Sequence, residues 1–375
     1  MPSDRLTATY ARSPESRAAA RLVYLLLLWA TACADGAYRA GRPAHQTDTL
    51  QAVSMTDVVP NDADDPAIWV DSSGQGRSVI LGTDKGDTTG GIFVFDLAGH
   101  IDSIRSRSPL RRMNNVDVAY GLAIRGGRID VAVGTERGRQ RLRVFRLPDM
   151  SPIDDGGIPV FDNDSSRAPM GIALYRRPRD GAVFAIVGRK SGPTRDYLWQ
   201  YRLEDRGDGT IRGVRVRTFG RFSGRKEIEA ITVDDALGYV YYSDETVGIR
   251  KYHADPDHPQ ADVELALIGT SGFVQDHEGL AVYPTSPTTG YLIASDQQGQ
   301  RIQLFRREGE GGAPHDHRAI ATIPVSAMET DGLEVTEYPV SERFPQGLLV
   351  MMSTDRRFHY FDWRDVIARI PLPAR

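Results

Sequence analysis

Acidic and amide side chains stand just before a series of short apolar runs, where together they could bind a divalent cation. The residues in these positions are Asp62, Asp64, Asp65, Asn114, Asn115, Asp117, Glu227, Glu229, Asp276, Glu278, Glu329 and Asp331. Carboxylates that converge on one place repel one another unless a cation lies between them. Because the set offers only oxygen ligands apart from His277, it favours calcium over zinc.

A second polar set falls in the turns that follow later apolar runs. It comprises Lys85, Arg137, Arg189 and Lys190, with Asp244, Glu245, Gln297, Asp355 and Arg356 in the equivalent turns. The only lysines of the chain are Lys85, Lys190, Lys226 and Lys251, and two of them occupy the same turn of different repeats. This recurrence indicates that the turn after the second strand requires the compact ammonium group of lysine. Cations beside calcium-binding carboxylates indicate a site for a polyanion such as a phosphate ester.

Each signal also has a plainer interpretation. A single polar turn of this kind is usually only a hairpin turn, and acids before a strand are often caps or solvated ends. His277 by itself is typical of a packing residue rather than a ligand. The functional interpretation depends on the recurrence of these residues in register.

The elements that must position these side chains form a sixfold repeat. The repeated runs are DDPAIWV (64–70), AYGLAI (119–124), PMGIAL (169–174), IEAITV (228–233), HEGLAV (277–282) and TDGLEV (330–335). Their small residues Pro66, Gly121, Gly171, Ala230, Gly279 and Gly332 lie about 50 to 60 residues apart, the length of one propeller blade. A second apolar strand, a polar turn and an aromatic-rich third strand follow each run.

This pattern predicts an all-β fold, a six-bladed β-propeller with four-stranded antiparallel blades around a central channel. In such a ring the first strand of each blade lines the channel, so both polar sets can gather at one mouth. We expect a strand within residues 51–59 to close the ring by pairing with the last blade. Helical periodicity is confined to residues 363–370.

Composition narrows the possible functions. The 375 residues carry a formal charge of -4 and one cysteine, which excludes a disulfide framework and a cysteine-based zinc site. No segment supplies the basic stripe that nucleic acid binding requires. We expect residues 51–375 to form one propeller domain and the protein to be a monomer, because a propeller is a single closed ring.

The N-terminus has the features of an export signal. Arg12, Arg17 and Arg21 precede an apolar run over residues 22–30, and small residues lead to Cys33. The run is too short to span a bilayer. We expect residues 1–32 to be a lipoprotein-type signal peptide, Cys33 to be the lipidated first mature residue, and residues 33–50 to be a tether. The protein would then be exported to the outer membrane, periplasm or cell surface and held there only by its lipid; ordinary secretion is the alternative.

Several longer motifs resemble those of the β-propeller phytases. They are DADDPAIWVD (62–71), MNNVDVAYG (113–121), GRKSG (188–192), EIEAITVDDALGYVYYSDET (227–246), DHEGLAVY (276–283), GYLIASDQQG (290–299), ETDGLEV (329–335) and FHYFDWRDVIA (358–368). Together they cover about residues 55–370 in the family's order.

The resemblance implies a calcium-dependent phosphoric monoester hydrolase of the 3-phytase type, acting on myo-inositol hexakisphosphate (phytate) near neutral pH. It assigns substrate phosphates to Lys85, Arg137 and Lys190, with the neighbouring Arg189. It assigns several calcium ions and the activated water to a shell made of Asp64, Asp65, Asn115, Asp117, Glu229, Asp244, Glu245, Asp276, Glu278, Gln297 and Asp331. Glu229 or a neighbour would accept the proton of the water. One family site residue aligns with both Asp244 and Glu245, and either of these two acids could take its role.

Two residues depart from the family pattern, and two other functions remain open. Met170 stands where the family has tyrosine, and Ser191 stands where it has glutamate, so we expect weaker phytate binding. A calcium-dependent propeller lactonase or esterase would use a similar acidic channel but would have little use for the cations. A non-catalytic binding propeller on the cell surface would need no metal.

Overall fold

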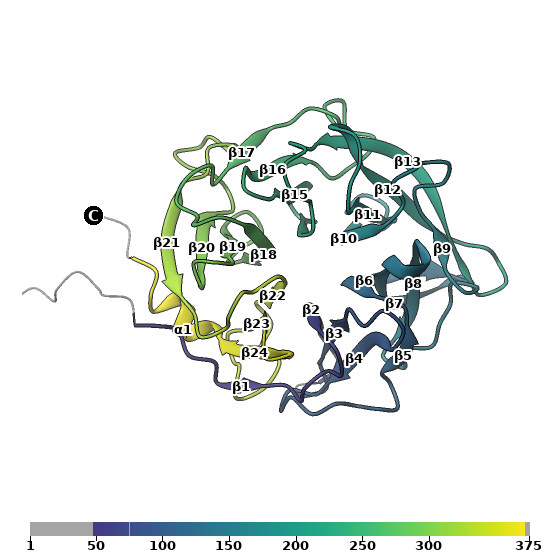
Figure 1. The fold of residues 1–375 in the computed structure, drawn as a ribbon, viewed down its shortest axis with the longest axis horizontal. Helices are drawn as coiled ribbons and strands as arrows, with labels where there is room; N and C mark the ends of the chain where they lie inside the picture. Colours follow the sequence, from purple (N-terminus) through teal and green to yellow (C-terminus); the bar gives the residue numbers. More distant parts are fainter. Residues whose placement is uncertain (1–47, 75, 372–375) are drawn as a thin grey trace, which may run out of the picture. The chain divides into compact units, whose positions relative to one another are not determined.

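Six four-stranded antiparallel sheets are arranged around one axis in the computed structural model, which describes residues 48–74 and 76–371 (Figure 1). They belong to the compact unit Gln46–Arg375. The predicted six-bladed β-propeller is thereby confirmed. The expected signal peptide, Cys33 and most of the expected tether lie outside the described residues.

In five blades the strands follow one another along the chain from the axis outward, and in the sixth the outermost strand comes from the N-terminal end of the described residues. The innermost strands are β2 (Ala63–Trp69), β6 (Met113–Ile124), β10 (Pro169–Arg176), β14 (Ile231–Asp234), β18 (His277–Pro284) and β22 (Leu333–Thr336). The second strands are β3 (Val79–Asp84), β7 (Gly127–Glu136), β11 (Val183–Arg189), β15 (Tyr239–Asp244), β19 (Gly290–Asp296) and β23 (Leu348–Ser353). Each innermost strand contacts the innermost strands of both neighbouring blades, which makes the ring continuous.

The outer half of each blade supplies the aromatic-rich strands and the edges. The third strands are β4 (Gly90–Phe95), β8 (Arg141–Leu147), β12 (Arg195–Asp205), β16 (Gly248–His253), β20 (Arg301–Arg306) and β24 (Arg357–Asp362). The outermost strands are β5 (Arg107–Leu110), β9 (Ile158–Pro159), β13 (Ile211–Arg221), β17 (Ala266–Ile268), β21 (Ala319–Pro324) and β1 (Ser54–Met55).

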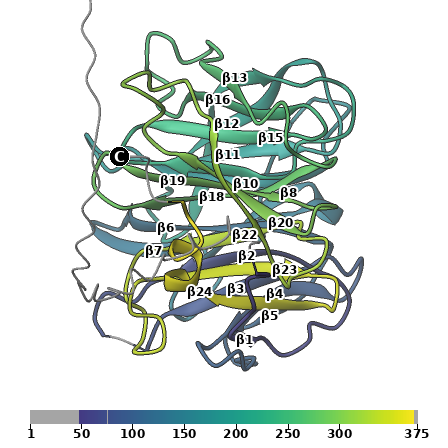
Figure 2. The same cartoon turned by 90° about the vertical axis from the view of Figure 1, so that its left-hand side faces the viewer.

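The N-terminal strand β1 closes the ring. It pairs antiparallel with β24, and the last sheet has the order β1-β24-β23-β22. Val53 N donates to Tyr360 O at 2.8 Å, and Thr56 N donates to Phe358 O at 2.9 Å. Both views show the C-terminal strands in yellow beside the first blade in purple and blue (Figures 1 and 2). The predicted closure by residues 51–59 is confirmed, and it covers an edge that would otherwise be free to pair.

Apolar side chains fill the junctions between the blades. The described residues form six core clusters, and each one combines residues of two neighbouring blades. Between the second and third blades, for example, Val131 and Val133 pack with Val187 and Trp199. Burial of these faces stabilises the ring because neighbouring sheets cover each other's apolar surface.

Helix is scarce, as expected. The 3-10 helix η1 (Arg137–Arg139) follows β7, and α1 (Trp363–Ile367) follows β24. Asp362 caps α1 by accepting a hydrogen bond from Arg364 N at 2.9 Å, and the Trp363 ring stacks on Tyr283 at 3.9 Å. No helix of the described residues has the length and apolar character needed to cross a bilayer.

Candidate functional site

A β-bulge near the start of the innermost strands places the polar residues. In four blades two consecutive residues of this strand stand opposite one residue of the second strand, as Asp64 and Asp65 do between the pairs Ala63↔Asp84 and Pro66↔Gly82. The bonds Ser243 N to Ala230 O and Met352 N to Gly332 O, each 3.0 Å, extend the same register to the other two blades. The first bulge positions are therefore Asp64, Asn114, Met170, Glu229, Glu278 and Asp331. A β-bulge changes the direction in which side chains leave the strand. Here the bulges place one side chain at the equivalent position of each of the six blades.

This register corrects the alignment of the repeats read from the sequence. Residues equivalent to Gly171 and Gly279 are Asp65 in the first blade and Asn115 in the second, rather than Pro66 and Gly121. Gly121 lies at a second irregularity of the long strand β6. The spacing of the small residues predicted the wrong alignment. Proline and glycine both occur near β-bulges, but they do not always occupy the same position of the bulge.

Hydroxyl groups on the second strands hold the bulge of the next blade. Thr135 Oγ1 donates to Met170 O at 2.7 Å, Ser243 Oγ donates to Glu278 O at 3.1 Å, and Ser295 Oγ donates to Thr330 O at 3.0 Å. Thr83 Oγ1 donates likewise to Asn114 O. Each bond satisfies a buried carbonyl and fixes the bulge region of one blade relative to the preceding blade.

Close approach between blades also explains two glycines. A Cβ at Gly171 would lie 1.8 Å from Glu229 O, and one at Gly332 would lie 2.4 Å from Asp65 Oδ1. Neighbouring bulges can therefore come this close only if these positions carry no side chain.

Lys85 joins carboxylates of two blades. Its Nζ lies 2.7 Å from Asp64 Oδ1 and 3.1 Å from Asp331 Oδ2. Asn114 Nδ2 donates to Asp64 Oδ2 at 3.1 Å and to Glu229 Oε1 at 2.7 Å, and the guanidinium of Arg137 donates to Asn114 Oδ1 at 3.4 Å. These contacts link predicted site residues of four blades into one network.

Two further lysines continue the network on its other side. Lys190 pairs with Glu227, and Lys226 Nζ lies 2.8 Å from Glu245 Oε2 and 2.7 Å from Asp276 Oδ2. Gln297 donates to Asp331, and Gln298 Nε2 donates to Asp276 Oδ2 at 2.8 Å. We call the whole set the mouth cluster; its members are Asp64, Lys85, Asn114, Arg137, Lys190, Lys226, Glu227, Glu229, Glu245, Asp276, Glu278, Gln297, Gln298 and Asp331.

The mouth cluster contains carboxylate groups that fit a metal ion. Glu227, Glu229 and Glu245 can bring one oxygen each within 4.8 Å of one another, and so can Glu245, Asp276 and Glu278. The atoms Glu245 Oε1, Asp276 Oδ1 and Glu278 Oε2 are buried without a hydrogen bond or ion pair among the described residues. Buried oxygens without partners are costly, and an oxygen-binding cation would satisfy them.

The pKa values of the mouth cluster also indicate that its carboxylates have too little positive charge near them. Burial raises the pKa of Glu229 to about 7 and that of Glu245 to about 8, although Lys85 and Lys226 respectively oppose the shift. Burial and the nearby Glu245 and Glu229 also raise the pKa of Glu278. Burial would lower the pKa of Lys85, but Asp64 and Asp331 outweigh it, so this pKa is raised and the lysine stays charged.

Five residues predicted for the site lie outside the mouth cluster, and two of them, Asp244 and Arg189, are engaged in ion pairs elsewhere. Asp244 accepts hydrogen bonds from Ser223 Oγ at 2.7 Å and from Arg250 Nε at 2.9 Å, so both of its oxygens are engaged away from the cluster. Arg189 is 1% exposed and lies 2.7 Å from Asp164, with its guanidinium over the ring of Phe161.

Register explains this placement, because Asp244 and Arg189 are each the last residue of a second strand. Asp84, Glu136 and Asp296 share that position and are likewise buried. Residues one position later are Lys85, Arg137, Lys190, Glu245 and Gln297, all of which belong to the mouth cluster. Of the two acids left open by the sequence, the structure therefore brings Glu245 into the cluster and leaves Asp244 out.

Three other predicted metal ligands lie further along the innermost strands. Asp65 Oδ2 accepts from Val116 N at 3.1 Å, and Asp117 Oδ2 accepts from Leu174 N at 2.6 Å. Asp117 lines a cavity of about 170 Å³ together with Asp235 and Glu334, and burial raises its pKa to about 7. Asn115 is buried, and its Oδ1 has no hydrogen bond among the described residues.

The two departures from the family pattern fall in the third blade. Met170 occupies the first bulge position but is apolar and 1% exposed, whereas Ser191 is exposed. The third blade thus contributes Lys190 to the mouth cluster without a carboxylate from either position.

Four members of the mouth cluster were not among the predicted site residues. Asn114 and Glu227 belong to the polar runs noted in the sequence, and Lys226 is one of the few lysines of the chain. The position of Asn114 and Glu227 in the repeat, and the rarity of lysine in the chain, were signals that could have identified these three residues. Gln298 carried no such signal, since its amide reaches Asp276 only across the turn after β19.

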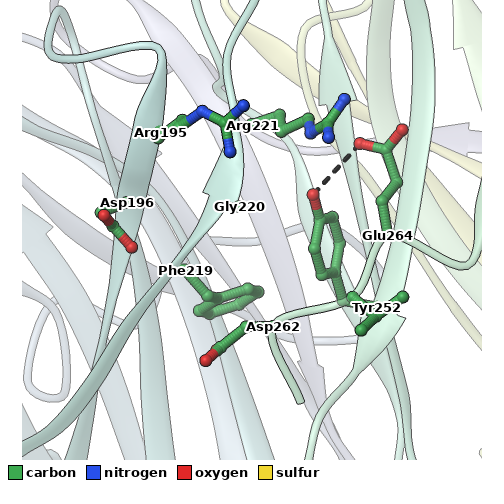
Figure 3. Close-up of a pocket in the computed structure, with 9 residues that line it drawn as sticks. Arg195, Asp196, Phe219, Gly220, Arg221, Tyr252, Asp262 and Glu264 are labelled. Atoms are coloured by element: carbon green, nitrogen blue, oxygen red, sulfur yellow. Dashed lines mark hydrogen bonds between the residues drawn. The ribbon is translucent and has the colours of Figure 1, made fainter. Parts of the chain in front are cut away.

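A larger cavity lies away from the mouth cluster. It has a volume of about 510 Å³ and is lined by Arg195, Arg221, Tyr252, Glu264 and neighbouring residues of the third and fourth blades, none of them in the mouth cluster. Figure 3 shows the hydroxyl of Tyr252 directed at Glu264, a hydrogen bond of 3.1 Å, with the two arginines nearby. Glu264 is also paired with Arg250 at 2.7 Å, so its carboxylate is neutralised by a residue outside the mouth cluster.

The fold and the mouth cluster together define a six-bladed propeller with an acidic, metal-binding type of site that also presents cations. The sequence profile described as Phytase matches residues 15–357, and the chain therefore belongs to the phytase family. A 3-phytase of Bacillus subtilis (strain 168) is 28% identical over 343 residues, which cover 87% of this chain and 83% of that protein. Among solved structures, Kuenenia stuttgartiensis hydrazine synthase aligns with a TM-score of 0.49 at 12% identity, over 79% of this chain and 82% of the other.

Proposed function

We propose that the protein hydrolyses phosphomonoesters of phytate in a calcium-dependent reaction that releases phosphate. The observation that carries this proposal is the combination at one mouth of three cations, Lys85, Arg137 and Lys190, with buried carboxylate oxygens that have no hydrogen-bond partner within residues 48–74 and 76–371. Membership of the phytase family and the similarity to a 3-phytase support the same reaction.

The three cations suit a substrate that carries several phosphates. They occupy equivalent positions after β3, β7 and β11, so they approach the mouth from three consecutive blades. Ammonium and guanidinium groups form strong charge-assisted hydrogen bonds with phosphate oxygens. One polyphosphorylated molecule can therefore be held at several of its phosphates at once.

The carboxylates of the mouth cluster would hold the metal. Two groups have oxygens within 4.8 Å of one another, and they consist of Glu227, Glu229 and Glu245, and of Glu245, Asp276 and Glu278. Bound calcium would neutralise the phosphoryl oxygens and lower the pKa of a bound water. Glu229 is oriented by the amide of Asn114 and is the residue that we expect to accept the proton of the attacking water.

No covalent phosphoenzyme is needed for this reaction. His277, the histidine within the predicted site sequence, lies with Nε2 2.7 Å from Gly269 O and its ring against Phe273, so it acts as a packing residue. Direct attack by water is the simpler route.

We also propose that the protein is an exported, monomeric lipoprotein anchored through Cys33. This proposal depends on the sequence of residues 1–33, which has the charged, apolar and small-residue segments of such a signal. Replacement of Cys33 by Ala should abolish labelling with a radioactive fatty acid; unchanged labelling would contradict it.

The proposed function is tested by phosphate release from phytate and by hydrolysis of a lactone, each with calcium and with chelator. We expect calcium-dependent phosphate release between about pH 6 and 8, where phosphate becomes mostly doubly charged, and no lactone hydrolysis. Lactone hydrolysis without phosphate release would favour a propeller lactonase. Absence of both activities would leave a propeller that only binds ligands.

A further inference from the structure

We propose that Lys226 is a tethered cation that competes with divalent metal for the group formed by Glu245, Asp276 and Glu278. The inference rests on the metal dependence proposed above. It predicts that this lysine sets how tightly the enzyme binds calcium at this group.

The contacts of Lys226 coincide with one predicted metal group. Its Nζ lies 2.8 Å from Glu245 Oε2, 2.7 Å from Asp276 Oδ2 and 3.9 Å from Glu278 Oε1. These three acids form one of the two groups whose oxygens lie within 4.8 Å of one another. The ammonium therefore sits where a metal ion would be held, and the two cations cannot occupy that position together.

The carboxylates are fixed, whereas the lysine can leave. The side chains of Glu245, Asp276 and Glu278 are 1 to 4% exposed, but that of Lys226 is 40% exposed. Lys226 also lies between β13 and β14 in a segment without regular strand, where its backbone is not part of a sheet. Lys85 differs, because its side chain is only 16% exposed and is held by carboxylates of two blades.

The ammonium satisfies the group only in part. With Lys226 in place, one oxygen of each acid still has no hydrogen bond or ion pair among the described residues. A calcium ion carries twice the charge and accepts more oxygen ligands than an ammonium. Calcium should therefore displace the ammonium of Lys226 from this group. The free energy needed for this displacement should weaken the apparent affinity of the protein for calcium.

Calorimetric titration of the full-length protein with calcium tests this competition. Lys226→Met removes the charge and keeps the length of the side chain, so calcium should bind roughly ten- to a hundredfold more tightly at one site. Lys226→Arg keeps a cation and should bind calcium about as the wild type does. Arg225→Gln is the matched control, because Arg225 is adjacent, exposed and in no ion pair among the described residues.

A second measurement needs no variant, and it guards against misfolding of Lys226→Met. Chemical acetylation of wild-type lysines, read by mass spectrometry, should become several-fold faster at Lys226 when calcium is added. The buried Lys251 should not respond.

Equal calcium affinity of the wild type and Lys226→Met, or tighter binding by the wild type, would overturn the inference and leave calcium dependence intact. Acetylation at Lys226 that ignores calcium would overturn it as well. No calcium binding by any variant would instead overturn the metal dependence on which it rests.

Discussion

The ammonium of Lys85 lies 2.7 Å from Oδ1 of Asp64, so a cation predicted to bind phosphate is held by a carboxylate predicted to bind metal. No other basic side chain of the described residues forms an ion pair with Asp64. The two functions of the mouth are therefore connected through Lys85, which also pairs with Asp331. A cation bound to the carboxylates would weaken the attraction of Asp64 for Lys85. The ammonium of Lys85 could then contact a phosphate more readily.

Arg137 gives the clearest test of phosphate binding. Its guanidinium makes a 3.4 Å hydrogen bond to Asn114 and no ion pair among the described residues, so its removal should disturb the fold little. Arg137→Ala should lower kcat/KM for phytate by roughly ten- to a hundredfold, through loss of a charge-assisted contact worth about 1.5 to 3 kcal/mol. Steady-state phosphate release checks this. Arg139→Ala, on the same turn, is the control, and an equal loss there would contradict a specific role.

Asp244 and Glu245 should respond differently to substitution. Glu245→Gln should reduce the rise in melting temperature on adding calcium, because it removes a predicted ligand. Asp244→Asn should lower stability by about 3 kcal/mol or more with or without calcium, since it breaks the buried pair with Arg250. Thermal unfolding in calcium and in chelator separates the two. A calcium response lost in Asp244→Asn but kept in Glu245→Gln would reverse the assignment.

The closing strand should dominate stability at the N-terminus. Deletion of residues 34–60 removes β1 and its bonds to β24, which exposes a strand edge and the apolar surface beneath it. We expect a sharp fall in melting temperature. Deletion of residues 34–47 alone is the control and should have little effect. If both deletions leave the melting curve unchanged, β1 does not hold the ring together.

Stability should fall on acidification through His253. Burial, then the charges of His258, His315 and Lys251, lower its pKa from 6.5 to about 4. Because the unfolded chain binds the proton more readily, stability is full above about pH 6.5 and is lost as pH falls toward 4. His253→Phe keeps the ring and should reduce this loss by about 1 kcal/mol at pH 5, a value discounted for the partial exposure of the ring.

Denaturant unfolding at pH 8 and pH 5, both in chelator, measures the effect of His253. His100→Phe replaces an exposed histidine and provides the comparison. An equal acid loss in wild type and His253→Phe would show that other groups cause it.

The sixfold repeat was predictable because it depends on local patterns. Five blades are runs of consecutive strands, and the sixth takes only its outermost strand from elsewhere in the chain, so alternation, turn residues and spacing record the repeat locally. Lys85, Arg137 and Lys190 were recognised for the same reason, since each follows a second strand directly. The end of the chain also showed its helical periodicity locally, as α1 confirms.

Membership of the mouth cluster was decided by the tertiary structure. Asp244 and Glu245 are adjacent and chemically alike, and only the folded blade directs one toward Arg250 and the other toward Lys226. Lys226 likewise reaches Asp276 from another blade, 50 positions along the chain. Ion pairs depend on separations of a few ångströms between blades distant in sequence. The sequence by itself therefore determined the blades and the kinds of side chain they carry, whereas packing of the closed ring decided which charges meet.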